Sequence, residues 1–159
     1  MSDTEMIDFL RNAKLLRGIS TDEAKLVFRY GKLVTLKKDD ILIKEGQHDH
    51  PLYIIVKGQV EVILPKKADG KERPTQIKLN RLSRGDCLGE YALIDSEPAS
   101  ASVVAVEEVE AFVIERRDFS RIIESGDSLA KHVYRNMLYI MTKRARDNNK
   151  ELDIYYDKF

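Results

Sequence analysis

The sequence predicts a mainly β domain with flanking helices, arranged as a β-sandwich or β-barrel between helical ends. Seven short stretches rich in β-branched and aliphatic residues occupy the middle of the chain, and glycine, proline and charged residues separate them at close intervals. Apolar residues before and after this region recur instead at spacings of three and four, which is typical of amphipathic helices. The 159 residues suit one domain over residues 1–159, which is large enough to bury about 70% of its unfolded surface.

The composition excludes several functional classes. Leu, Ile, Val and Phe make up about 29% of the chain, above the roughly 20% below which chains tend to stay disordered. Lys and Arg number 27, as do Asp and Glu, so the chain lacks the basic excess that nucleic-acid binders use. The one cysteine, Cys87, cannot close an internal disulfide, which fits a reducing compartment such as the cytoplasm. An acidic N-terminus and the lack of an apolar run of about 18 residues argue against an export signal and a membrane helix.

Residues 1–31 are expected to form an N-terminal segment of two short helices. The apolar residues of the first helix recur at helical spacing: Met6, Phe9, Leu10 and Ala13. Asp3 or Thr4 can act as its cap. The second helix is expected to begin after Ser20, which stands in capping-box register with Glu23, and to end at Gly31.

Residues 32–117 are expected to form the β region. Seven stretches have the composition of strands: residues 32–38, 41–46, 52–58, 59–65, 75–83, 100–107 and 108–116. The segments between them carry turn residues, so successive strands are expected to pair closely rather than to alternate with helices.

Residues 118–150 return to helical spacing. Asp118 is the candidate cap of a short helix that Gly126 interrupts, and a longer helix follows from about Ser128. The apolar residues of the longer helix mark one side: Leu129, Val133, Met137, Ile140 and Met141. Its C-terminal half carries basic residues, which suit a helix C-terminus: Lys143, Arg144, Arg146 and Lys150. The apolar stripe can pack on the β region, pair with another subunit, or do both. In the tail over residues 151–159, the segment DIYYDKF, residues 153–159, follows no clear period and is expected to fray.

The segment from residue 82 to residue 105 has the most informative spacing. Gly85 and Gly89 permit a close backbone approach, and a single helical turn can follow the second glycine. The free N–H groups at the start of such a turn can hold an anion, and Glu90 can accept a hydrogen bond from a sugar hydroxyl beside it. Ser100 offers a hydroxyl from the far side of the same loop. An ordinary glycine-rich connection between strands remains the alternative.

The segment GEYALIDSEPASASVVA, residues 89–105, resembles the phosphate-binding cassette of cyclic nucleotide-binding domains. These domains occur in catabolite-activator-type regulators, kinase regulatory subunits and gated channels. FLRNAKLLRGIS resembles the N-terminal helices of that family, ILIKEGQHDHPLYIIVKGQVEV its Glu-Gly turn and following strands, and RRDFSRII and YIMTKRARDNN its C-terminal helices. The resemblance implies an eight-stranded β-roll, similar to a jelly roll, with N-terminal helices and a long C-terminal helix.

The resemblance also implies a ligand site for cAMP or cGMP, with no cofactor and no metal. Its residues are Gly89, Glu90, Tyr91, Ala92, Ala99, Ser100 and Ala101. Glu90 occupies the position that accepts the ribose 2′-hydroxyl, and the amides from Gly89 to Ala92 those that hold the cyclic phosphate. Ser100 and Ala101 match the small or hydroxyl residues of the family, whereas Tyr91 replaces an aliphatic residue.

Ala99 departs from the family pattern, which has an arginine there that pairs with the phosphate. A charge-assisted hydrogen bond contributes about 1.5 to 3 kcal/mol, so its loss predicts phosphate binding weaker by roughly ten to a hundred times. Arg84 and Arg135 are candidates for a substitute cation, although surface solvation is the simpler role for each.

His48 and His50 suggest an enzyme alternative, because two histidines with one residue between them resemble the first metal motif of cupins. No glutamate follows at the spacing that cupins require, and His132, the third histidine, lies in the C-terminal helix. No metal site is therefore expected, and His48 and His50 are expected to lie on a solvent-exposed turn. Ser100 has no basic neighbour in sequence that would make it a nucleophile, so no enzyme is expected. Residues 151–159 are too few for a helix-turn-helix, which argues against direct DNA reading.

Two functions remain. The first is a stand-alone regulatory domain that senses cAMP or cGMP and signals to an unidentified protein partner through its C-terminal helix, with Gly126 as a flexible joint. The alternative is a degenerate domain of the same fold that binds no nucleotide and acts as a protein-interaction module. Gly89, Glu90 and Ser100 favour the first and Ala99 the second. A homodimer is also expected, through the stripe of Leu129, Val133, Met137 and Ile140.

Overall fold

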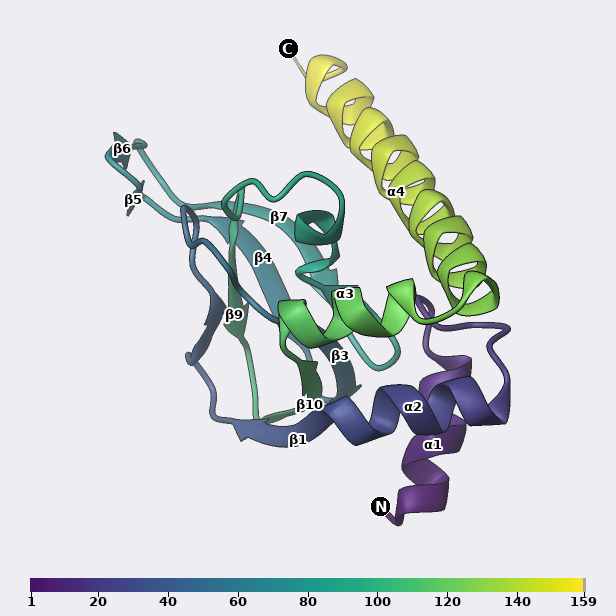
Figure 1. The fold of residues 1–159 in the computed structure, drawn as a ribbon. Coiled ribbons are helices and arrows are strands. Elements are labelled where there is room, and N and C mark those ends of the chain that lie inside the picture. Colours follow the sequence, from purple (N-terminus) through teal and green to yellow (C-terminus); the bar gives the residue numbers. More distant parts are fainter. Residues whose placement is uncertain (159) are drawn as a thin grey trace.

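Two four-stranded antiparallel sheets form a β-roll in the computed structural model, which describes residues 1–158 (Figure 1). The first sheet has the order β1 (Gly31–Leu36), β10 (Val109–Ile114), β3 (Leu52–Lys57) and β8 (Cys87–Leu88). The second has the order β2 (Ile41–Ile43), β9 (Ser102–Ala105), β4 (Val60–Leu64) and β7 (Ile77–Leu82). These strands confirm the expected eight-stranded roll with flanking helices.

Three short strands were not expected from the sequence. β5 (Lys67–Ala68) and β6 (Lys71–Glu72) pair as a separate ribbon that projects from the roll (Figure 1). β8 has two residues, paired with Tyr53 and Ile54 of β3. Two residues cannot display the alternation that identifies a strand in sequence. The seven stretches expected to be strands each contain one.

Helices enclose one side of the roll: α1 (Asp3–Asn12), α2 (Thr21–Tyr30), α3 (Arg116–Glu124) and α4 (Asp127–Tyr156). The capping box expected at Ser20 and Glu23 is present, but α1 is capped by Ser2 rather than by Asp3 or Thr4. Asp118 is not a cap either, since α3 begins at Arg116 and places Asp118 in its first turn. The helical region therefore begins at residue 116 rather than 118.

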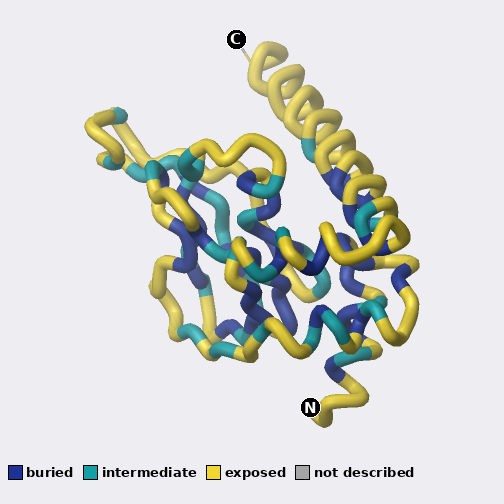
Figure 2. Tube along the Cα trace, viewed as in Figure 1, coloured by how far each residue is buried: buried dark blue, intermediate teal, exposed yellow. Residues whose placement is uncertain are grey.

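The core has two parts, which Figure 2 shows as the dark segments inside the roll and beneath the helices. One cluster lies between the sheets and includes Ile55, Val60 and Val113. The larger cluster joins the first sheet to all four helices, and the apolar stripe of α4 belongs to it: Leu129, Val133, Met137 and Ile140. This stripe therefore packs on the chain itself and is not available to a second subunit, whereas Met141 lies outside it and is exposed.

The C-terminal half of α4 projects beyond the roll, and most of its residues are exposed (Figures 1 and 2). The expectation that residues 153–159 fray is wrong for residues 153–156, which continue the helix, and Phe159 lies outside the described residues. Lys150, Glu151 and Leu152 are strong helix formers, so propensity carries the helix past its packed part. Within residues 1–158 no helix has both the length and the apolar character needed to cross a membrane.

Candidate ligand-binding site

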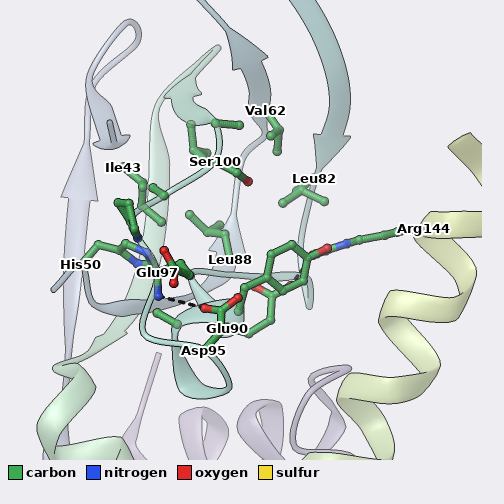
Figure 3. A pocket seen from close by; sticks show the side chains of 17 residues that line it. Ile43, His50, Val62, Leu82, Leu88, Glu90, Asp95, Glu97, Ser100 and Arg144 are labelled. Carbon is green, nitrogen blue, oxygen red and sulfur yellow. Dashed lines mark hydrogen bonds and ion pairs between the residues drawn. The ribbon is translucent and has the colours of Figure 1, made fainter. Parts of the chain in front are cut away.

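A cavity of about 180 Å³ opens between the second sheet, the loop after β8 and the middle of α4 (Figure 3). All seven residues expected at the ligand site line it: Gly89, Glu90, Tyr91, Ala92, Ala99, Ser100 and Ala101. The strands and the end of β8 supply apolar walls: Ile43, Val62, Leu82, Leu88 and Val103. The structure thus brings the predicted residues together around one hollow, whose lining is mainly apolar with a smaller polar part.

The turn that follows β8 has the geometry expected from its glycine. Gly89 has φ +86°, and a Cβ atom there would lie 2.4 Å from the carbonyl oxygen of Pro51. The short 3₁₀ helix η1 (Glu90–Leu93) begins directly after it, and no side chain caps its N-terminus. The amides of Glu90 and Tyr91 precede the first hydrogen bond of this 3₁₀ helix and have no partner within it, so they offer N–H donors beside the cavity.

Glu90 is a buried carboxylate in the cavity wall, with 2% of its surface exposed. Its Oε1 accepts a hydrogen bond from Nη1 of Arg144, which forms an ion pair. Burial raises the pKa of Glu90 above its ordinary value, while the guanidinium of Arg144 opposes that rise. The ion pair with Arg144 therefore favours the charged form of the buried Glu90 carboxylate, which can accept hydrogen bonds.

Arg144 reaches the cavity from α4, on the side opposite His50 (Figure 3). Besides Glu90, its Nη2 donates to the carbonyl oxygen of Cys87 at 3.0 Å and its Nη1 to the hydroxyl of Tyr91 at 3.4 Å. Burial lowers the pKa of Arg144, but the Glu90 carboxylate, together with Tyr91 and Cys87, outweighs this effect, so the pKa lies above its ordinary value.

The sequence did not single out Arg144 as a site residue. It is 54 positions from Glu90, and basic residues are common in the last turns of helices. One signal was available, because Arg144 lies four residues after Ile140 and therefore continues the buried face of α4. An arginine in line with a buried stripe points toward the domain rather than into solvent.

The loop around Ala99 is held by backbone hydrogen bonds and carries no cation. The amide of Ala99 donates to Gln47 O at 3.0 Å, and Gly46 donates to Ala99 O at 2.8 Å. Neither Arg84 nor Arg135 lines the cavity. Arg84 donates to Val56 O at 2.6 Å, and its guanidinium lies 4.6 Å from the ring centroid of Phe9. These contacts hold the guanidinium of Arg84 outside the cavity.

His50 differs from the expectation of a solvent-exposed pair of histidines. His48 is exposed, but His50 is 4% exposed and lines the cavity. It packs against Gly89, because a Cβ atom on that glycine would lie 3.1 Å from Nδ1 of His50. No group of three or more His, Cys, Asp or Glu residues suited to a metal ion occurs within residues 1–158.

A family model for the cyclic nucleotide-binding domain matches residues 33–125, more than half of the chain. The chain belongs to the cyclic nucleotide-binding domain family. The matched range contains the roll, the cassette and α3 but ends before α4, so Arg144 lies outside it.

Relatives of this family domain occur in proteins of several kinds. cGMP-dependent protein kinase 2 of Mus musculus is 31% identical over 132 residues, which cover 82% of this chain and 17% of the kinase. A solved cyclic nucleotide-binding domain from Methylobacillus flagellatus KT has a TM-score of 0.77 at 24% identity and covers 93% of this chain and 80% of its own. The regulatory subunit of a cAMP-independent protein kinase A from Trypanosoma cruzi, solved bound to guanosine, has a TM-score of 0.66 at 28% identity and covers 76% of this chain and 41% of its own.

Proposed function

We propose that this family domain is a regulatory sensor that binds cAMP or cGMP in the cavity and signals to a protein partner through α4. The observation that carries the proposal is the buried Glu90, which lies at the start of a 3₁₀ helix with free N–H donors, in a hollow with apolar walls. The carboxylate suits a ribose hydroxyl, the amides suit phosphate oxygens, and the walls suit a base.

The route from the cavity to α4 runs through Arg144. A ribose hydroxyl that donates to Glu90 enters the hydrogen-bonding shell of Arg144, whose three partners are Glu90, Tyr91 and Cys87. Binding therefore biases the position of α4 relative to the roll. Gly126, directly before α4, has no atom within 4 Å of the Cβ it lacks, so the joint has room to bend.

A second candidate function rests on Ala99. Without the family arginine, the domain can keep its fold and serve as a protein-interaction module without a nucleotide ligand. The T. cruzi subunit was solved bound to guanosine, a nucleoside that carries no phosphate. A nucleoside is therefore a further candidate ligand for this chain.

Calorimetric titration of the full chain with cAMP and cGMP tests the proposal. We expect weak binding that Glu90→Gln reduces by at least about tenfold, because the amide accepts a ribose hydroxyl without charge assistance. Glu61→Gln is the matched control, since Glu61 also pairs with an arginine, Arg81, but lies outside the cavity. No heat and no thermal shift at millimolar ligand, in folded protein, would leave the protein-interaction module as the function.

A further inference from the structure

The charged groups around the cavity are unbalanced. Three carboxylates line it, Glu90, Asp95 and Glu97, against one guanidinium, that of Arg144. Glu90 and Arg144 form an ion pair, whereas Asp95 and Glu97 make no ion pair with any residue of the described chain 1–158. A cyclic monophosphate entering this cavity brings a negative charge to a wall that already carries two uncompensated ones.

Ala99 lines the cavity at the position where the family pattern has an arginine that pairs with the phosphate. Both backbone groups of Ala99 are engaged, by Gln47 and Gly46, so the loop is fixed in this form. The nearby arginines are committed elsewhere: Arg73 to Glu45, Arg84 to Val56 O and Arg116 to Ser96 and Asp49. The cavity thus offers a phosphate the turn amides and the hydroxyl of Ser100 but, among the described residues, no side-chain cation that is free of another partner.

Glu90 suits a ligand with two adjacent hydroxyls. Its carboxylate has two oxygens and about four acceptor positions, and the bond from Arg144 uses one of them on Oε1. A ribonucleoside presents both a 2′- and a 3′-hydroxyl to such an acceptor. A 3′,5′-cyclic monophosphate presents only the 2′-hydroxyl, because its 3′-oxygen is esterified.

We infer that this cavity binds uncharged ribonucleosides more tightly than their 3′,5′-cyclic monophosphates. The inference rests on the proposed ribose site at Glu90 and names the ligand class of that site. Glu90 receives the vicinal hydroxyls, the turn amides donate to the sugar oxygens, the apolar walls hold the base, and Asp95 and Glu97 repel a phosphate.

Calorimetry of the full chain with guanosine, adenosine, cGMP and cAMP, at low salt, tests this order of affinities. We expect at least one nucleoside to bind about tenfold or more tightly than its own cyclic monophosphate. The 2′-deoxy and 3′-deoxy forms of that nucleoside should each bind about tenfold more weakly, since each removes one donor to Glu90.

Two variants test the electrostatic cause. Ala99→Arg should reverse the order by raising cyclic nucleotide affinity roughly ten to a hundredfold, and Ala99→Gln should recover less because it carries no charge. Asp95→Asn with Glu97→Gln changes two exposed side chains, so folding is preserved, and should raise the affinity for cyclic monophosphates relative to nucleosides.

Each outcome decides the matter. Cyclic monophosphates that bind as tightly as the nucleosides, or more tightly, would overturn the inference and leave the proposed function standing. No binding of either class to folded protein would overturn both. An affinity ratio unchanged in the Asp95 and Glu97 variant would remove the electrostatic argument.

Discussion

The carboxylate of Glu90 depends on one residue from a distant part of the chain for its charge balance. Arg144 is the ion-pair partner of Glu90 in the described residues, and its side chain is 22% exposed against 2% for Glu90. Breaking a buried ion pair by removing one partner usually costs about 3 to 5 kcal/mol, because the other charge stays buried. The same residue therefore bears on stability and, in the proposed function, on ligand binding and on the placement of α4.

Arg144→Met should lower the free energy of unfolding by up to about 3 kcal/mol at neutral pH. The pKa of Glu90, already raised by burial, then rises further without its counter-ion. A raised pKa in the folded state means that stability is fully present below the ordinary pKa and is lost as the pH rises through the folded value. The deficit should therefore shrink between pH 7 and pH 5 in urea denaturation. Arg135→Met, at an exposed position of the same helix, should change stability by less than about 0.5 kcal/mol, and an equal loss in both variants would contradict this account.

Gly89 and Gly85 form a matched pair for testing the turn after β8. Both have φ +86°, a left-handed backbone conformation that costs a residue with a Cβ atom about 1 to 2 kcal/mol. Alanine at either position therefore destabilises the folded state by this amount. A Cβ atom at Gly85 meets no atom within 4 Å, whereas at Gly89 it meets Pro51 O at 2.4 Å. Gly89→Ala should therefore lower the melting temperature clearly more than Gly85→Ala. Equal melting temperatures would show that the turn is not packed as described.

At the level of elements, α4 has two apolar faces, one buried and one exposed. Leu129, Val133 and Met137 pack on the chain's own core. A second row is exposed and has the four-and-three spacing of a heptad seam: Tyr134, Leu138, Met141 and Leu152, with Ala145 and Asn148 at the positions between. This row runs for three heptads, the minimum for a coiled coil.

A homodimer thus remains a prediction, but through a different face of α4 from the one the sequence suggested. Light scattering should report a dimer at high concentration, and Leu138→Glu with Leu152→Glu should convert it to a monomer. Tyr139→Glu is the control, since Tyr139 is 71% exposed but lies off the seam. A wild-type monomer, or a dimer that the seam variant leaves intact, would reject the seam.

For the whole molecule, local patterns predicted the strands, the helices and the turn after Gly89, whereas the resemblance to cyclic nucleotide-binding domains supplied the eight-stranded roll and the roles of the cassette residues. Strand alternation, the capping box at Ser20 and the spacing of Gly85, Gly89 and Glu90 are readable within a few residues. All seven expected site residues consequently line one cavity.

What sequence reasoning missed depends on contacts between distant segments. Arg144 reaches Glu90 across 54 positions, and the burial of His50 follows from its packing against Gly89. The stripe of Leu129 and Val133 was read correctly as apolar, but periodicity cannot say whether an apolar face meets the chain's own core or a partner. The long-range partners of a helix face come only from the assembled fold.

In the proposed function a ribose-bearing ligand binds at Glu90 and α4 responds through Arg144. Nuclear magnetic resonance titration of the full chain with guanosine and with cGMP tests this most directly, by following backbone amides and the Arg144 side-chain Nε–H together. We expect the amides from Gly89 to Ala92 and the Nε–H of Arg144 to shift with one common dissociation constant, and Glu90→Gln to weaken both responses. Shifts confined to residues outside the cavity, or cassette shifts with no change at Arg144, would contradict it.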